Sequence, residues 1–340
     1  MKHKTFFWFV LPSVLAMLLF IAFPIVSVVL QSLHVSHEQV IVQVENCGPF
    51  GCTQSTKIDT EATEALRAAQ PLGRWAGLST YLDRGHLAVG EVAAEWRNAA
   101  SMSEFLGRLT NLPFYKAMFF TLSYTFIVTP LTLIFGFAIA VAVNSAAKTL
   151  RGPLIFFTLL PMIVTPLVGS LILFWMVDAR GIIGVALQWA AGDPNLSVKA
   201  STPLMWIVLM VYGVWHAAPF AFIVYYAGLQ TVNKETLEAA VVDGASRWER
   251  IRYVVLPHLL PLTTFIALIQ LMDNFRVFEP IVSFSAQAHA TSLSWAIYNN
   301  LGGETRQLSS AAATSVLTII GIAILLSPVL VRTWRDFSRK

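Results

Sequence analysis

Long segments without any charged residue dominate the chain. Each is longer than the roughly 20 apolar residues that a helix needs to cross a bilayer. The pattern therefore predicts five membrane-spanning helices. The segments that contain no Asp, Glu, Lys or Arg are Thr5–Leu33, Ala117–Ala147, Gly152–Val177, Ala200–Asn233 and Gln307–Val331.

A sixth apolar segment, Leu259–Ser283, carries charge only in its second half, at Asp273, Arg276 and Glu279. Of the 340 residues, 56% are apolar and 12% are charged, whereas soluble domains contain about 25% charged residues. We therefore predict an all-α membrane protein with six transmembrane helices and a large extracytoplasmic loop between helices 1 and 2.

The first apolar segment follows Lys2 and Lys4, as in a signal peptide. However, the apolar region of a signal peptide is only about 7–15 residues long and ends at a cleavage site with small residues. Phe6–Leu33 is too long, and Gln31–His34 is a poor cleavage site. We interpret it as a retained first helix.

The expected organisation is a first helix within residues 1–33, an outer loop over 34–113, and a core over 114–340 that contains helices 2–6 and the inner loop 231–258. Within the outer loop, the sequence predicts one helix near Thr60–Ala69 and a segment at the membrane interface over Ser103–Leu109. Pro161 and Pro166 should kink the third helix. Helices 2–6 are expected over Phe114–Val143, Pro153–Val177, Pro203–Gln230, Leu259–Ser283 and Leu308–Val331.

Basic residues in short loops collect on the cytoplasmic side of membrane proteins. With six helices both termini share one side. That side, with its loops, carries twelve basic residues, against three in the two short loops opposite. Both termini are therefore predicted to be cytoplasmic. The net charge of +4 reflects this bias and requires no nucleic-acid partner.

Both cysteines, Cys47 and Cys52, fall in the outer loop within Cys-Gly-Pro-Phe-Gly-Cys. Closely spaced thiols outside the cytoplasm tend to oxidise, so a disulfide is expected. Two free thiols are the alternative. A metal site is not expected, because two thiols without nearby His or further Cys fall short of four ligands.

The longest inner loop, 231–258, mixes charged and apolar residues. Asp243-Gly244 is a helix stop, and Ser246 with Glu249 forms a capping box for a second helix. We predict two short helices joined at Gly244 and ending at Pro257. From the residues alone, an amphipathic pair that only covers the membrane surface is an equal alternative.

The same loop contains Glu238-Ala239-Ala240, then Asp243-Gly244-Ala245, then Leu256-Pro257. This spacing resembles the EAA signature of permease subunits of binding-protein-dependent ABC importers. The resemblance implies that the loop is a coupling helix that docks on a separate ATPase subunit. It also implies that Glu238 pairs with a basic residue of that subunit, and that Gly244 permits the bend.

The chain has no ATPase signature of its own. A P-loop requires Gly-x-x-x-x-Gly-Lys-Ser/Thr, and no Gly-Lys pair occurs in the sequence. ATP and Mg are therefore expected only in partner subunits. A self-sufficient channel or secondary transporter is the alternative class, but it leaves the signature loop unexplained.

Charged residues inside a membrane span are costly and usually functional. Asp273, Arg276 and Glu279 are spaced to share one helical face, so they are either a substrate site or an ion-pair ladder within the bundle. The run Asp273–Glu279 resembles the D-x-F-R-x-F-D element of carbohydrate permeases of the maltose type. Glu279 replaces the last Asp, and the Gly-rich turn that follows in the family is missing.

The resemblance implies sugar contacts at Met272, Asp273 and Arg276 on helix 5. It implies further contacts on helix 4 at His216, Ala217 and Phe220, within a Trp-x-x-x-Pro-aromatic element. Aromatic faces pack on sugar rings, and carboxylate, guanidinium and amide groups bind hydroxyls. A lone intramembrane His is often only hydrogen-bonded within its bundle, so His216 has that alternative role.

Together these features predict a non-enzymatic permease subunit in the bacterial cytoplasmic (inner) membrane. A second permease subunit, two ATP-binding subunits and an extracytoplasmic solute-binding protein would complete the importer. The expected solute is a carbohydrate. Polyols, glycerol-phosphate-type molecules and acidic or sulfonated sugars are the alternatives, since Arg276 suits an anion.

Overall fold

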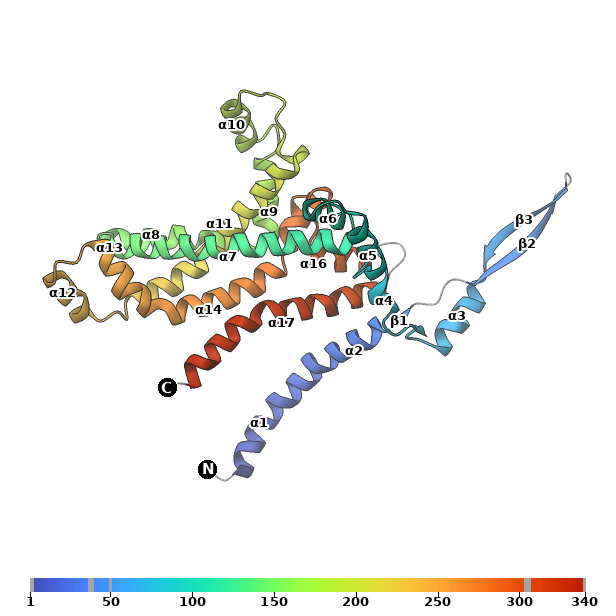
Figure 1. Cartoon of the computed structure of the whole chain (residues 1–340), viewed down its shortest axis with the longest axis horizontal. Helices are drawn as coiled ribbons and strands as arrows, with labels where there is room; N and C mark the ends of the chain where they lie inside the picture. The colour runs from blue at the N-terminus through green and yellow to red at the C-terminus, as the bar shows by residue number, and fades with distance from the viewer. Residues whose placement is uncertain (1–2, 36–39, 49–50, 303–306, 339–340) are drawn as a thin grey trace. The chain divides into compact units, whose positions relative to one another are not determined.

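The computed structural model of the chain describes residues 3–35, 40–48, 51–302 and 307–338 (Figure 1). It consists of two units that are interleaved along the chain. One comprises residues 1–115 and 296–319, and the other comprises residues 116–295 and 320–340.

Long apolar helices make up most of the described chain. Five are long and apolar enough to cross a membrane, and a sixth span is present if one bent helix pair is counted. The all-α membrane architecture is thereby confirmed. The five spans are Phe6–Ser32, Pro113–Ser145, Thr202–Leu229, Arg247–Phe275 and Leu308–Arg332.

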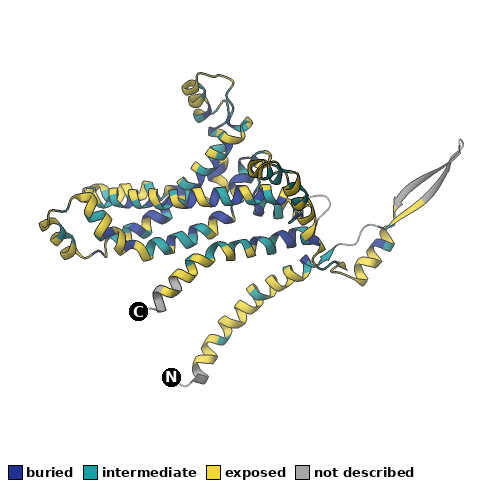
Figure 2. Ribbon diagram, viewed as in Figure 1, coloured by how far each residue is buried: buried dark blue, intermediate teal, exposed yellow. Residues whose placement is uncertain are grey.

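The first span comprises α1 (His3–Met17), a π-helical segment Leu18–Ala22 and α2 (Phe23–Ser32). None of its most apolar stretch is buried within the chain, as Figure 2 shows. An apolar helix surface that the chain itself does not bury is stable only in hydrocarbon or against another subunit. Phe6–Ser32 is thus an apolar helix that the described chain leaves exposed, and its retention in the mature protein stays a prediction.

The third predicted helix, Pro153–Val177, is not continuous. It consists of α8 (Lys148–Ile163) and α9 (Pro166–Met176), which bend by 94° at Val164 and Thr165. Thr165 is extended (φ −60°, ψ 144°), as expected for a residue that precedes proline. The predicted kink is therefore present, but it turns the chain through a right angle.

The fifth predicted helix also differs from the prediction. After α14 (Leu256–Phe275) the chain leaves the helix over residues 276–278 and resumes in α15 (Glu279–Ser283). Pro280 cannot donate a hydrogen bond to the carbonyl of Arg276, so a continuous helix through this point would lose a bond and meet the proline ring. Leu259–Ser283 is consequently two helices rather than one.

Close helix crossings hold the second unit together. α7 (Pro113–Ser145) approaches α11 (Thr202–Leu229) where Gly136 faces Ala221, and α11 approaches α14 where Gly228 faces Leu259 and Leu262. A β-carbon at either glycine would overlap the facing helix. Small residues at crossings allow the close approach that drives helix association in lipid.

Two clusters of buried side chains form the core of this unit. One joins α7, α11 and α15 through Phe120, Leu209 and Ile281. The other joins α7, α11 and α14 through Val143, Phe222 and Leu259. The two clusters fix the three long helices that position the site described below.

The outer loop contains more structure than the sequence predicted. The helix expected over Thr60–Ala69 is confirmed as α3 (Thr60–Ala69), with Asp59 accepting a hydrogen bond from the Ala62 amide (3.0 Å). The expected interface segment Ser103–Leu109 lies in α6 (Met102–Leu109). The remaining elements are β1 (His34–Val35), β2 (Ile41–Gly48), β3 (Gly51–Ile58), β4 (Arg74–Trp75), α4 (Ser79–Leu82) and α5 (Val89–Asn98).

Polar contacts join α5 to α6. The Arg108 guanidinium bonds Glu95 (3.0 Å) and Glu104 (2.7 Å), and Trp96 packs edge-on against Phe105. The backbone amide of Ala100 and the Arg108 guanidinium lower the pKa of the Glu104 carboxyl. The ion pairs are partly exposed, so each contributes little to stability and mainly orients the two helices.

The strands β2 and β3 form a hairpin in which Cys47 and Cys52 are paired residues. Their side chains lie outside the described residues, so the disulfide stays a prediction. Closing so short a loop should stabilise the outer segment only modestly. Mass spectrometry of protein isolated without reductant should find the cross-linked peptide. Two alkylatable thiols in air-exposed protein would contradict it.

An ion pair closes the segment between α9 and α11. The Lys199 ammonium lies 2.7 Å from the Asp178 carboxylate and 3.3 Å from the centre of the Phe174 ring. The hydrogen bond from Lys199 lowers the pKa of the Asp178 carboxyl. Within this segment lie α10 (Ile182–Ala191) and a 3₁₀ turn, Val198–Ala200.

Because Gly184 has no side chain, the first turn of α10 can pack closely on the backbone that follows α9. A β-carbon at this position would overlap the Asp178 carbonyl, which is rigid backbone. Gly184→Ala should therefore destabilise the protein by about 1–3 kcal/mol through overpacking. Thermal unfolding in detergent should show this loss.

Gly152→Ala is the matched control, because no atom lies within 4 Å of the β-carbon it would add to α8. It should unfold at or above the temperature of the parent, since Ala favours a helix over Gly. Equal unfolding temperatures for both variants would show that the Gly184 contact does not matter.

Candidate functional site

A polar cavity of about 620 Å³ lies within the second unit, between α7, α11, α14 and the start of α15. The bend between α8 and α9 closes one side through Met162 and Pro166. Such a volume accommodates a small ligand. Both places where the long helices break, at residues 164–165 and 276–278, therefore border this cavity.

The structure brings together most of the residues predicted to contact a solute. His216, Ala217, Phe220, Asp273 and Arg276 all line the cavity. Met272 is not among the lining residues, although it is 38% exposed elsewhere on α14. The lining residues of α14, which are Ile269, Gln270, Asp273 and Asn274, share one face at about 100° per residue, and Met272 falls beyond the edge of that face.

Asp273 and Arg276 form an ion pair at the end of α14. The guanidinium Nη2 lies 2.7 Å from Asp273 Oδ1, and both side chains are about half exposed (51% and 55%). The Arg276 amide also donates to the Asp273 carbonyl (3.1 Å), which closes the last turn of the helix. The pair is therefore both a structural contact and part of the cavity wall.

Glu279 does not share the helical face predicted for it. It begins α15, beyond the break, and is exposed to the same cavity. It makes no ion pair with any residue that the structure describes. The shared helical face predicted for the three charges is therefore wrong, and the alternative of a three-charge ladder is not formed: Asp273 and Arg276 pair, and Glu279 makes no ion pair with them.

Two amide side chains of α14 were missed by the sequence reasoning. Asn274 is buried and donates to Thr129 Oγ1 on α7 (2.9 Å). Gln270 is only 4% exposed, lines the cavity, and makes no hydrogen bond within the described part of the chain. Their spacing with Asp273 is helical, and polar residues inside a span are themselves a signal.

His216 stacks on Tyr212 at 5.8 Å between ring centroids. Its Nε2 is buried and has no hydrogen-bond partner among the described residues. Tyr212, in turn, donates to the Pro166 carbonyl at the bend (2.8 Å). A buried, unpaired ring nitrogen beside an unpaired amide gives the cavity groups that a bound hydroxyl can satisfy.

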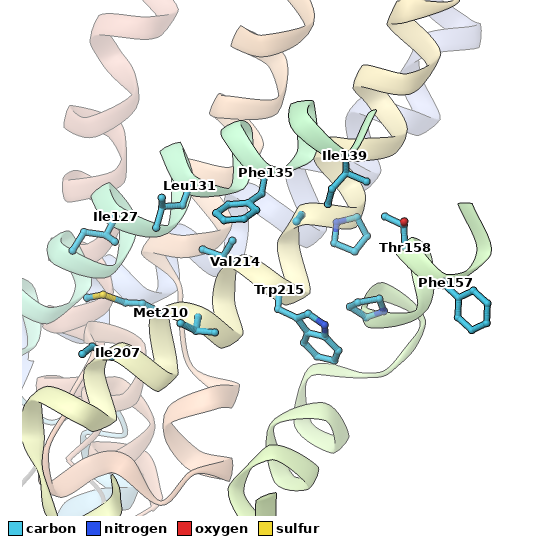
Figure 3. A pocket seen from close by; sticks show the side chains of 14 residues that line it. Ile127, Leu131, Phe135, Ile139, Phe157, Thr158, Ile207, Met210, Val214 and Trp215 are labelled. Carbon is cyan, nitrogen blue, oxygen red and sulfur yellow. The ribbon is translucent and has the colours of Figure 1, made fainter. Parts of the chain in front are cut away.

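A second cavity, of the same volume, lies on another side of α11, against α7 and α8 (Figure 3). Its lining is almost entirely apolar, with Phe135, Met210 and Trp215 among the labelled side chains. Trp215 and His216 are adjacent, so α11 separates an apolar face from a polar one. Only the polar cavity suits a hydroxylated solute.

The inner loop folds as two short helices, α12 (Lys234–Val242) and α13 (Arg247–Arg250). The predicted bend is confirmed at Gly244, which has φ +80°. The predicted capping box is also confirmed: Glu249 N donates to Ser246 Oγ (3.3 Å), and Ser246 N donates to the Glu249 carboxylate (2.8 Å). The backbone of the loop thus follows from its own residues.

The prediction that the second short helix ends at Pro257 is wrong. α13 continues through a π-helical segment, Ile251–Val255, into α14, so that Arg247–Phe275 is one span. The Leu256 amide bonds the Ile251 carbonyl, five residues back. This wider turn brings the chain to Pro257, which has no amide proton to donate.

The remaining signature residues lie along this loop and its junction with α14. Glu238 is exposed and pairs with no residue in the described ranges. Val242 and Trp248 expose 86% and 68% of their surfaces, while Leu237 packs against the second core cluster. The other signature positions, by number, are Ala239, Ala240, Asp243, Ala245, Leu256 and Pro257.

No group of three His, Cys, Asp or Glu side chains close enough to hold a metal ion occurs among the residues that the structure describes. The remaining described elements are α15, a 3₁₀ turn Ala286–Ala288, α16 (Leu293–Gly302) and α17 (Leu308–Ser338).

Comparison with known proteins gives concordant matches. The family model "Binding-protein-dependent transport system inner membrane component" matches residues 113–336. The trehalose/maltose transport system permease protein MalF of Thermococcus litoralis is 27% identical over 232 residues, covering 64% of this chain and 74% of that protein. The sn-glycerol-3-phosphate transport system permease protein UgpA of Yersinia pestis is 30% identical over 239 residues, covering 66% and 79%.

A solved bacterial ABC transporter involved in import of the acidic polysaccharide alginate shares the fold. One of its chains superimposes with a TM-score of 0.60 at 20% identity, covering 81% of this chain and 96% of that one.

Proposed function

Because this chain belongs to the family of binding-protein-dependent transport system inner membrane components, we propose that its polar cavity is half of a translocation pathway for a carbohydrate. The chain is a multi-pass inner-membrane permease subunit of an ABC importer and has no catalytic role of its own. The finer assignments below concern the solute, the partners and the orientation.

The polar cavity is the observation that carries the carbohydrate assignment. It places two carboxylates, a guanidinium, two amides and an imidazole around a volume of about 620 Å³, with Tyr212 and Phe220 as aromatic walls. These groups match the hydroxyls and C–H faces of a sugar. The similarity to a trehalose/maltose permease supports the same class.

A second candidate solute class is a glycerol-phosphate-type anion. It is favoured by the similarity to UgpA. Polyols and acidic or sulfonated sugars use the same kinds of groups. A self-sufficient secondary transporter is the least supported alternative, because it would have no use for the inner loop.

The complete importer is proposed to contain a second permease, two ATP-binding subunits that use ATP and Mg, and an extracytoplasmic solute-binding protein. Exposed Glu238, Val242 and Trp248 on the inner loop would meet the ATP-binding subunit. This places both termini and the loop in the cytoplasm, in agreement with the basic residues. Solute would reach the cavity from the opposite side.

Gly244 tests the coupling role of the loop. No atom lies within 4 Å of an added β-carbon, so only the left-handed backbone, at φ +80°, opposes a side chain. A branched residue there costs about 1–2 kcal/mol or more, whereas Asn tolerates this conformation. Gly244→Val should abolish solute-stimulated ATP hydrolysis and uptake, while the protein remains in the membrane.

Gly244→Asn is the matched control and should retain most uptake. The measurement is ATPase activity and uptake in proteoliposomes that contain the complete transporter. Normal coupling in Gly244→Val would remove the assignment of this loop as the coupling element.

The Asp273–Arg276 pair tests the solute site against a purely structural role. If the pair only holds the helix end, Asp273→Asn removes the partner of a half-exposed Arg276, and the double variant with Arg276→Gln should take up solute normally. If the pair binds solute, the double variant should assemble normally but lose uptake by at least about tenfold, the size of one or two lost hydrogen bonds to charged groups.

The matched control is the exposed pair Arg84–Glu91, which lies outside the cavity at 3.5 Å. Arg84→Gln with Glu91→Gln should leave uptake unchanged. Assembly is checked by co-purification of the other subunits. Full uptake by a well-assembled Asp273→Asn/Arg276→Gln protein would remove the pair from the solute site.

A further inference from the structure

The balance of charge on the cavity wall is not neutral. Within the part of the chain that the structure describes, its charged lining residues are Asp273, Arg276 and Glu279. The first two compensate each other at 2.7 Å. Counting His216 as neutral, the lining therefore carries one unpaired negative charge, and that charge belongs to Glu279.

The fold gives Glu279 this position. The break over residues 276–278 ends α14 and turns the chain, so Glu279 begins a new helix instead of continuing the old face. Pro280, buried directly behind it, enforces the break. The carboxylate is consequently exposed to the cavity but separated from the Asp273–Arg276 pair.

One opposing contribution comes from the backbone. α9 begins at Pro166 on the cavity wall, and a helix N-terminus acts as roughly half a positive charge. This is smaller than the full charge of a carboxylate. The wall remains negative.

We propose that Glu279 is a specificity-determining residue that makes this half of the pathway reject anionic solutes and admit uncharged polyhydroxy ones. The proposal rests on the proposed function of the cavity and decides between its two leading solute classes. The Arg276 guanidinium, which would suit an anion, is already paired with the Asp273 carboxylate. A phosphorylated or uronic solute would meet an unpaired carboxylate, whereas hydroxyls find Gln270 and His216.

The sign of the cavity charge can be measured without knowing the solute. Ala217 lines the cavity and is small, so Ala217→Cys introduces a reporter thiol. Cys47→Ser and Cys52→Ser remove the native thiols. In the complete transporter in nanodiscs, the reporter is treated with a cationic methanethiosulfonate (trimethylammonium-ethyl) or an anionic one (sulfonatoethyl). Each rate is divided by the rate of the same reagent with 2-mercaptoethanol.

The cationic reagent should react faster than the anionic one. Glu279→Gln should lower the ratio of the two normalised rates about tenfold, the effect of one charge at roughly 10 Å on reagents of opposite sign in a partly aqueous site. Glu279→Asp keeps the charge and should keep the ratio. Glu64→Gln, which removes an exposed carboxylate on α3, should also leave it unchanged.

A ratio at or below one, or a ratio that Glu279→Gln does not lower, would overturn the charge assignment while leaving the cavity on the pathway. A thiol that resists both reagents, with and without ATP and vanadate, would overturn the proposed pathway and this inference with it. If Glu279→Gln fails to assemble, the ratio in the parent and in Glu279→Asp decides.

Discussion

Every backbone amide and carbonyl in a bilayer needs a partner within the protein, and the rest of this structure depends on that constraint. Long helices satisfy it automatically. Two breaks in the described helices of the second unit, at residues 164–165 and at 276–278 directly after α14, border the polar cavity. Non-helical backbone at membrane depth is tolerated where it lines a polar space.

Side-chain hydrogen bonds hold the backbone beside each break and the segment that packs on it. At the first break, the Tyr212 and Ser170 hydroxyls donate to the Pro166 carbonyl. At the second, Ser292 Oγ donates to the Val277 carbonyl (2.6 Å), and Thr121 Oγ1 accepts from the Leu293 amide (3.1 Å). The same bonds that permit the breaks thus hold the cavity walls in place.

The inner loop obeys a different constraint. Its polar residues lie at the surface, where water can satisfy them, so its shape depends on local conformational preferences. Asn233 and Ser246 cap the two short helices, and Gly244 supplies the left-handed turn between them. In the proposed function, movement of a partner subunit would pass through this loop to the helix that continues into α14.

For the same reason, the sequence alone determined the loop and the membrane class. Charge-free runs require lipid, and the capping box, the glycine turn and the helix Thr60–Ala69 each depend only on neighbours in sequence. These features needed no knowledge of distant contacts. Helix 4 was likewise predicted to within a residue at each end, as Thr202–Leu229, because one long apolar run has a single way to span.

Tertiary structure decided where the helices break and which side chains meet. Pro161 and Pro166 indicated a kink in the third helix, but the 94° turn and the end of α14 at Phe275 are accompanied by bonds from Tyr212 and Ser292, far away in sequence. The break, in turn, separates Glu279 from Asp273 and Arg276. Periodicity assumes one continuous helix, so it predicted three charges on one face, whereas the fold left one charge unpaired.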